Sequence, residues 1–170
     1  MKRITKCIVV FITLVLATVC LGKPVYILTV KDADAQSILL TRKVDPGFEF
    51  ATLIRHSVQT TPVYEYYRVE KDKTLTVVRT ELQDLGWGMP STLNHKVEFK
   101  NNYMIMDKID RNLKFLPFRV NHIAKPCIII DNKKIDLTKH VKNDGLIHVY
   151  VQKTPNIRYI LRGNINVFKE

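Results

Sequence analysis

Hydrophobic and polar positions alternate along most of the chain after residue 22, in short runs that are rich in Val, Ile, Thr, Tyr and Phe. Turn-forming residues separate one run from the next, as in Asp45-Pro46-Gly47 and Asn143-Asp144-Gly145. This pattern is typical of β-strands. We predict strands near residues 24–31, 36–43, 48–56, 63–71, 74–82, 95–100, 102–107, 113–120, 126–131, 133–137, 145–152 and 157–168. Only residues 136–142 are expected to be helical, as a single turn capped by Asp136 or Thr138.

Many short strands at this spacing favour an all-β fold, either an antiparallel β-sandwich or a barrel-like domain. The chain has 170 residues, of which 46% are hydrophobic, and this is enough for one core of ordinary size. No repeat and no linker divides the strand-rich part.

The first 22 residues have a different pattern, because a basic start is followed by an uncharged and mostly apolar stretch over residues 7–22. Lys23 and Pro24 end this stretch. The pattern predicts an apolar N-terminal helix that is either a signal peptide or a membrane anchor. We therefore divide the chain into residues 1–22 and a single β-rich exported domain over residues 23–170. The expected location is the periplasm or the outer face of the cytoplasmic membrane.

Cysteine usage and charge narrow the class of protein. Cys127 is the one cysteine outside the apolar stretch, and we expect it to be a small buried hydrophobe within Cys127-Ile128-Ile129-Ile130. The net charge is +11, and the excess lies mainly in residues 107–170, which hold 13 basic and 6 acidic residues. Such a surface suits an anionic membrane or an acidic partner, or it is simply a solvated face. No nucleic-acid-binding motif is present, so nucleic acid is not an expected partner.

The hairpin around residues 56–65 is the first candidate site. Alternation places His56 on the same strand face as Phe50, and Glu65 on the same face as Tyr67. The intervening loop ends at Pro62, so we predict that His56 and Glu65 lie within side-chain reach. A carboxylate on an apolar face needs a partner, and a His–Glu contact would provide one. The pair is either a binding or acid–base site or a structural contact that fixes the hairpin.

Catalytic and metal chemistry have little support. Ser57 follows His56 directly on a strand, so the two side chains point to opposite faces and cannot act as nucleophile and base. The remaining histidines are scattered without metal-ligand spacing. We therefore expect no enzyme activity, no metal and no cofactor.

Two further segments are candidates for binding. Gly86-Trp87-Gly88-Met89-Pro90 combines flexible glycines with a Trp that is either exposed to a ligand or folded onto the core. Arg111 and Arg119 flank an apolar segment around Pro117, which itself suggests an edge strand or a bulge. Either arginine can clamp a carboxylate or pack as a surface residue.

The stretch from Phe50 to about Val151 resembles the domain-of-unknown-function family 1850. The resemblance rests on His56, Ser57, Val58, Thr61, Pro62, Val63, Glu65, Gly86, Gly88, Met89, Pro90, Arg111, Leu116, Pro117, Arg119, Val120, Asp136, Leu137 and Gly145. It implies a small exported protein, and it implies an association with TAXI-type TRAP transporters because members are often encoded beside them. The family brings no activity with it.

These observations lead to two hypotheses. The first is a non-enzymatic exported accessory protein of a TRAP-type organic-anion uptake system, which contacts the permease or its binding protein. The alternative is a β-barrel or sandwich that binds a small molecule or lipid, with Trp87, Tyr64, Tyr66 and Tyr67 at its mouth.

Overall fold

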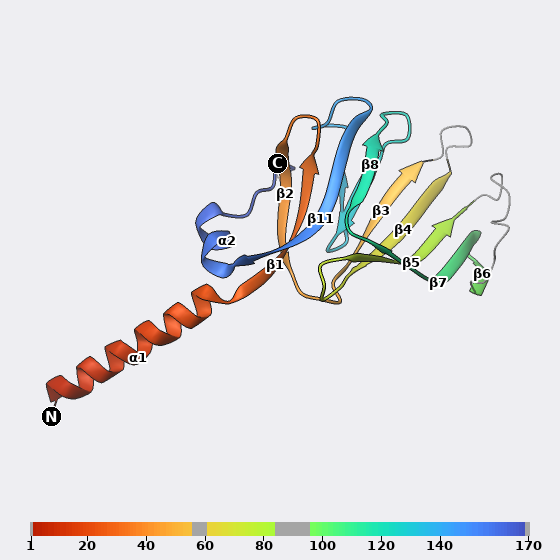
Figure 1. Ribbon diagram of the computed structural model, residues 1–170. Helices are drawn as coiled ribbons and strands as arrows, with labels where there is room; N and C mark the ends of the chain where they lie inside the picture. The colour runs from red at the N-terminus through yellow and green to blue at the C-terminus, as the bar shows by residue number, and fades with distance from the viewer. Residues whose placement is uncertain (1, 56–60, 84–95, 169–170) are drawn as a thin grey trace.

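The computed structural model describes residues 2–55, 61–83 and 96–168. An N-terminal helix projects from a body of two stacked β-sheets, as Figure 1 shows. The elements are α1 (Lys2–Gly22), β1 (Pro24–Asp32), β2 (Ser37–Val44), β3 (Glu49–Arg55), β4 (Pro62–Val69), β5 (Leu75–Leu82), β6 (Lys96–Lys100), β7 (Tyr103–Leu113), β8 (Leu116–Val120), β9 (Cys127–Ile130), β10 (Lys133–Asp136), β11 (Gly145–Pro155) and α2 (Asn156–Arg162).

The strands form a four-stranded sheet in the order β2-β1-β11-β8 and a seven-stranded sheet in the order β10-β9-β3-β4-β5-β7-β6. Every pairing is antiparallel. Within the described residues both sheets end in edge strands, so the fold is an open sandwich. This confirms the predicted all-β antiparallel class and selects the sandwich over the closed barrel.

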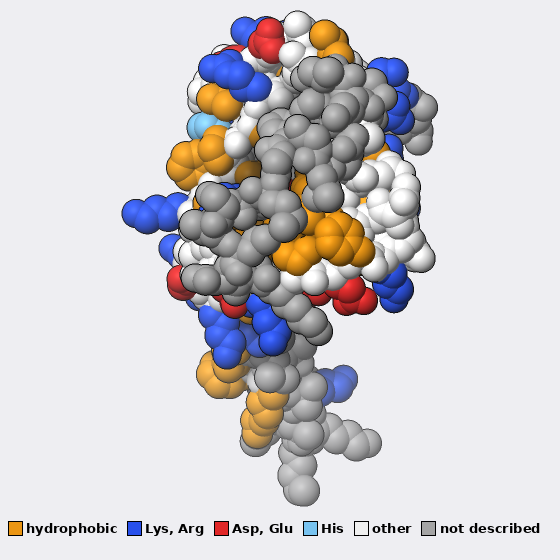
Figure 2. Space-filling view, turned by 90° about the vertical axis from the view of Figure 1, so that its right-hand side faces the viewer, with side chains coloured by type: hydrophobic (Ala, Val, Ile, Leu, Met, Phe, Trp, Pro, Cys, Tyr) orange, Lys and Arg blue, Asp and Glu red, His pale blue; other side chains and the backbone are white. Residues whose placement is uncertain are grey.

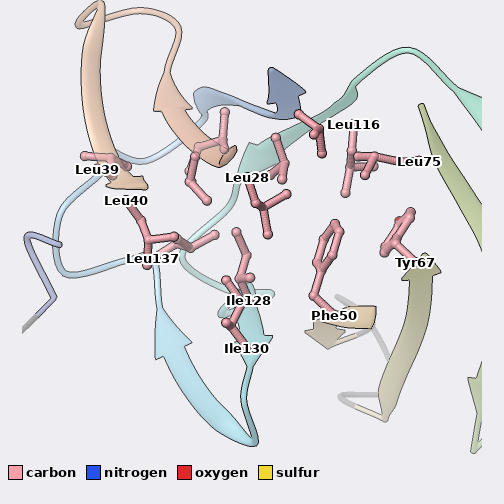
Figure 3. Packing of buried hydrophobic residues seen from close by; sticks show 14 of the residues in the cluster. Leu28, Leu39, Leu40, Phe50, Tyr67, Leu75, Leu116, Ile128, Ile130 and Leu137 are labelled. Atoms are coloured by element: carbon pink, nitrogen blue, oxygen red, sulfur yellow. The ribbon is translucent and has the colours of Figure 1, made fainter. Parts of the chain in front are cut away.

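The core lies between the two sheets, where alternate side chains of both layers meet (Figure 3). Leu28 and Ile128 are almost fully buried and come from opposite sheets. The rings of Phe50 and Tyr67 stack on neighbouring strands with centroids 5.2 Å apart. Cys127 is buried, as predicted, and burial raises the pKa of its thiol.

The large sheet extends beyond the small one. Its contribution to the core cluster comes from β9, from Phe50 in β3, and from residues 67–77 of β4 and β5. We call these parts the covered region. We call the remaining parts the open region, which consists of residues 62–65 of β4, residues 80–82 of β5, β6, and residues 103–107 of β7. Among the described residues, none of these belongs to the core cluster.

One predicted strand is wrong. Residues 157–168 form the short helix α2 and an extended C-terminal segment instead. Pro155 ends β11, and Ile157, Ile160 and Leu161 recur at helical rather than alternating spacing. Gly163, at φ 71°, then ends the helix. The helical period was present in the sequence, but the high β-propensity of isoleucine masked it.

The boundaries of two other strands differ from the prediction. β7 continues to Leu113 and belongs to the large sheet, whereas β8 begins at Leu116 and belongs to the small sheet. The chain therefore crosses from one layer to the other within the segment predicted as a single strand over 113–120. Pro117 lies on β8, an edge strand of the small sheet, where a residue without an N–H donor is tolerated.

Among the residues whose side chains are described, no helix is long and apolar enough to cross a membrane. The single turn predicted over 136–142 is present, because the amides of His140 and Val141 both donate to the carbonyl of Leu137. Asp136 caps it by accepting hydrogen bonds from the amide and hydroxyl of Thr138, at 2.9 and 2.7 Å.

Candidate functional site

A polar cluster lies on the inner face of the large sheet, at the boundary between the covered and open regions. It contains Glu65 and Tyr67 from β4 and Arg111 from β7. The Tyr67 hydroxyl donates to Glu65 Oε2 at 2.7 Å, and Arg111 Nη2 lies 3.9 Å from Glu65 Oε1. Glu65 and Arg111 are separated by 46 positions in the sequence but meet across β5.

The three side chains differ in burial. Tyr67 is completely buried, whereas the side chains of Glu65 and Arg111 are 34% and 60% exposed. Burial and the neighbouring Glu65 carboxylate raise the pKa of Tyr67, so the phenol stays protonated and remains a hydrogen-bond donor. The cluster therefore has a fixed inner end at Tyr67 and a solvent-accessible guanidinium at its outer end.

A bulge in β7 positions Arg111. Between the pairs Val77–Arg111 and Arg79–Asp107, β7 contains two more residues than β5. Lys108 and Asp110 adopt left-handed backbone conformations there, at φ 57° and 50°. Such a bulge redirects side chains, and here it places Arg111 beside core residue Val77 on the inner face.

Two rows of side chains continue from the cluster into the open region. Directly paired residues of antiparallel strands point to the same face, so the register defines each row. The first row is Thr52, Glu65, Thr80, Met106 and Val97. Thr52 and Thr80 are 7% and 6% exposed, so Glu65 lies between two buried hydroxyl-bearing residues.

The second row is apolar along its whole length and crosses five strands: Ile54, Val63, Leu82, Met104 and Phe99. Its two ends are exposed, Ile54 at 41% and Phe99 at 65%. A hollow of about 450 Å³ beside the β6–β7 turn is lined by Leu82, Phe99 and Met104. Figure 2, which views the molecule from the β6 side, shows apolar side chains at the surface on that side.

The cluster suits recognition better than acid–base chemistry. Arg111 can donate two parallel hydrogen bonds to an incoming carboxylate, while Glu65 keeps its bond from Tyr67. Within the described ranges no group of three or more His, Cys, Asp and Glu residues is close enough to hold a metal ion.

The predicted site residues fall into three groups. His56, Ser57, Gly86, Trp87, Gly88 and Pro90 lie outside the described residues, and so does the predicted His56–Glu65 contact. Glu65 and Arg111 come together as described above. Pro62 pairs with Arg55 at the start of β4, three positions from Glu65 along the strand.

Arg119 lies apart from this cluster, on β8 in the small sheet. Its Nη1 donates to the carbonyl oxygen of Asp144 at 2.8 Å. This bond attaches the turn before β11 to β8, so Arg119 has a structural contact there.

The tyrosines proposed to line one mouth do not share a face. Tyr67 is in the core, whereas Tyr66 and Tyr64 alternate with it and point to the outer face of the large sheet. The Arg79 guanidinium lies 4.0 Å from the centre of the Tyr66 ring and 3.2 Å from Glu81, which accepts a bond from the Tyr66 hydroxyl. The sequence analysis placed Tyr67 at a ligand mouth and not as the partner of Glu65, although their shared strand face was the available signal.

Comparison with known families adds one finding. The chain matches the family described as Domain of unknown function (DUF1850) over residues 50–137, which is more than half of its length.

The protein belongs to the DUF1850 family. The matched segment extends from Phe50 in β3 to Leu137 after β10, so it contains Glu65, Tyr67, Arg111 and the apolar row. No curated protein and no solved structure matches the chain.

Proposed function

We propose that this DUF1850 protein is a non-enzymatic, exported accessory protein of a TRAP-type organic-anion uptake system. It acts by contact with the permease or with the solute-binding protein of that system. The resemblance to exported, transporter-associated proteins supplies the partner class, and the basic, then apolar N-terminal segment supports export.

The observation that carries the proposal is the open region of the large sheet. Its inner face carries an apolar row in which Met104 is buried and the end residues Ile54 and Phe99 are exposed. Beside the row stands a charged group, Arg111, fixed near a buried tyrosine. Protein interfaces combine an apolar centre and a few aromatic or arginine anchors in this way. The open region therefore suits a protein partner that presents an apolar surface and an acidic side chain opposite Arg111.

The proposal is tested by measuring association of the full-length protein with the cognate solute-binding protein and with the permease in nanodiscs. Low salt preserves the electrostatic part of binding. We expect Phe99→Ser and Arg111→Gln each to weaken association by at least about tenfold, because both residues act as anchors. Neither variant should alter the unfolding midpoint greatly, since both side chains are more than half exposed.

Ile123→Ser is the matched control. Ile123 is 70% exposed, similar to Phe99, but it is not a member of the apolar row and lies near the opposite end of the row from Phe99, where the Ala124 carbonyl accepts from the Arg55 amide. Its substitution should leave association unchanged. The proposal is wrong if wild-type protein binds neither component at high micromolar concentration, or if Phe99→Ser and Ile123→Ser have equal effects.

A further inference from the structure

A second concave surface lies on the opposite side of the sandwich, where the free edges of the two sheets approach each other. A cavity of about 580 Å³ opens between β2 of the small sheet, the β9–β10 hairpin of the large sheet and the C-terminal segment over residues 164–168. This volume is within the range of small-molecule sites in proteins. The residues that line it are different from those of the Glu65–Tyr67–Arg111 cluster.

The wall formed by the C-terminal segment is held in place by backbone bonds to β2. The Thr41 amide donates to the Ile165 carbonyl at 2.8 Å, and the Val167 amide donates to the Leu39 carbonyl at 3.0 Å. The Ile165 amide donates in turn to Thr41 Oγ1 at 2.9 Å. The cavity is therefore pre-formed, which lowers the entropic cost of binding.

Part of the lining is apolar. Leu40 and Ile130 are 4% and 5% exposed, and they reach the cavity from the two different sheets. Phe168 adds an aromatic surface and makes an edge-to-face contact with His140, with ring centroids 4.7 Å apart. The cavity can thus hold the apolar body of a ligand.

The charged part of the lining is basic. Arg42, Lys133, Lys134 and Lys139 line the cavity together with two aspartates. Both aspartates are already engaged. Asp131 forms an ion pair with Arg42, with Asp131 Oδ2 2.6 Å from Arg42 Nη2. Asp136 caps the turn by accepting hydrogen bonds from Thr138.

The two lysines of β10 remain for a ligand. Within the described residues Lys133 and Lys134 are exposed and take part in no ion pair. They are consecutive on β10, so their side chains point to opposite faces: Lys133 pairs with the core residue Ile130 and shares its face, whereas Lys134 pairs with Ile129. The ammonium group of Lys133, beside an apolar floor, favours a negatively charged group attached to an apolar body.

We propose that this cavity binds a small organic anion, with its acidic group at Lys133 and its apolar body against Leu40, Ile130 and Phe168. This site is separate from the partner surface of the open region, so either can exist without the other.

The test uses phenylacetate as the probe, because it joins one carboxylate to one ring. Isothermal titration of the full-length protein in a nonionic detergent should show saturable binding at concentrations up to about 10 mM. The uncharged analogue phenylacetamide should bind at least about tenfold more weakly. The double variant Lys133→Gln/Lys134→Gln should lose phenylacetate affinity by a similar factor of about ten.

Two control variants locate the site. Lys71→Gln/Lys73→Gln removes another exposed lysine pair, from the β4–β5 turn, and Arg111→Gln removes the arginine of the other site. Both should bind phenylacetate like the wild type. The proposal is overturned by any of three results: absence of phenylacetate binding, equally strong binding of phenylacetamide, or unchanged phenylacetate affinity in the Lys133/Lys134 variant. None of these results tests partner association through the open region.

Discussion

Strand β4 crosses both the covered and the open region of the large sheet, and the two ends of this one strand differ in burial. On the inner face, Val69 and Tyr67 are completely buried beneath the small sheet. Glu65 and Val63 follow on the same face but are only half-buried. Both ends are regular strand, but among the described residues only the Tyr67–Val69 end packs into the core between the two sheets.

This difference in burial indicates that the covered and open regions of the large sheet contribute differently to stability and to binding. The covered region carries the stability, because it removes the larger apolar surface from water. Among the described residues the small sheet does not cover the open region, and the apolar row there has exposed ends at Ile54 and Phe99. We propose that these ends and Arg111 serve a partner. The Glu65–Tyr67 hydrogen bond joins the two regions.

The largest expected effect compares the same change, Val to Ala, at two positions of β4, one in each region. Val69→Ala should lower the free energy of unfolding by about 2–3 kcal/mol, because it removes two fully buried methyl groups and leaves a cavity. Val63→Ala should lower it by less than about 1 kcal/mol, because its side chain is only half-buried. Denaturant titration measures both values. Equal losses would show that the open region is packed as tightly as the covered one.

A smaller effect concerns Tyr67. Tyr67→Phe should cost about 0.5–1.5 kcal/mol at neutral pH, because the hydrogen bond to Glu65 is lost while the ring remains stacked on Phe50. It should also make stability less sensitive to alkaline pH. Burial, followed by Glu65, raises the pKa of Tyr67 in the folded state above its ordinary value of 10.0. The contribution of the protonated phenol is therefore complete below pH 10.0 and decreases as pH rises above it.

Tyr103 provides the contrast in the open region. Burial also raises its pKa, but its ring is only partly buried. Unfolding free energies measured between neutral pH and about pH 11 should decline less steeply in Tyr67→Phe than in Tyr103→Phe. If Tyr103→Phe flattened the decline as much as Tyr67→Phe, the boundary between the regions would lie elsewhere than at Tyr67.

The smallest expected effect is a gain in stability at the bulge. Lys108 has a left-handed backbone at φ 57°, a conformation that glycine adopts without strain. Lys108→Gly should therefore raise the free energy of unfolding by up to about 1 kcal/mol. Lys114→Gly, at an exposed lysine without such a backbone, should give no gain. A loss of stability in Lys108→Gly would mean that the lysine side chain, not the backbone, holds the bulge.

Much of the fold was predictable because strand signals are local. Alternation and turn residues located ten of the eleven described strands to within a few residues, and only β7 was much longer than expected. Its continuation depends on a bulge with two left-handed non-glycine residues, which no local pattern announces. The helix α2 was missed because β-propensity outweighed a helical period of only seven residues.

The candidate site was predictable only in part. The face of Glu65 followed from alternation with Tyr67, and the need for a partner followed from the cost of burying a carboxylate. The sequence favoured His56 as that partner, which lies outside the described residues. The partners that the structure does describe are Tyr67, two positions away, and Arg111, which pairing across β5 brings close.

The sequence by itself determined where most strands run, which side chains share a strand face, that Cys127 is buried and that Pro117 lies at an edge or a bulge. These properties depend on neighbours a few positions apart, so a single chain specifies them. Only the tertiary structure decided that β7 and β8 belong to different sheets, that the small sheet covers one part of the large one, and that Arg111 reaches Glu65. The cavity at Lys133 and Lys134 likewise exists only because two sheet edges and the C-terminal segment meet. Contacts of this kind depend on which surfaces pack together, and a strand pattern leaves that choice open.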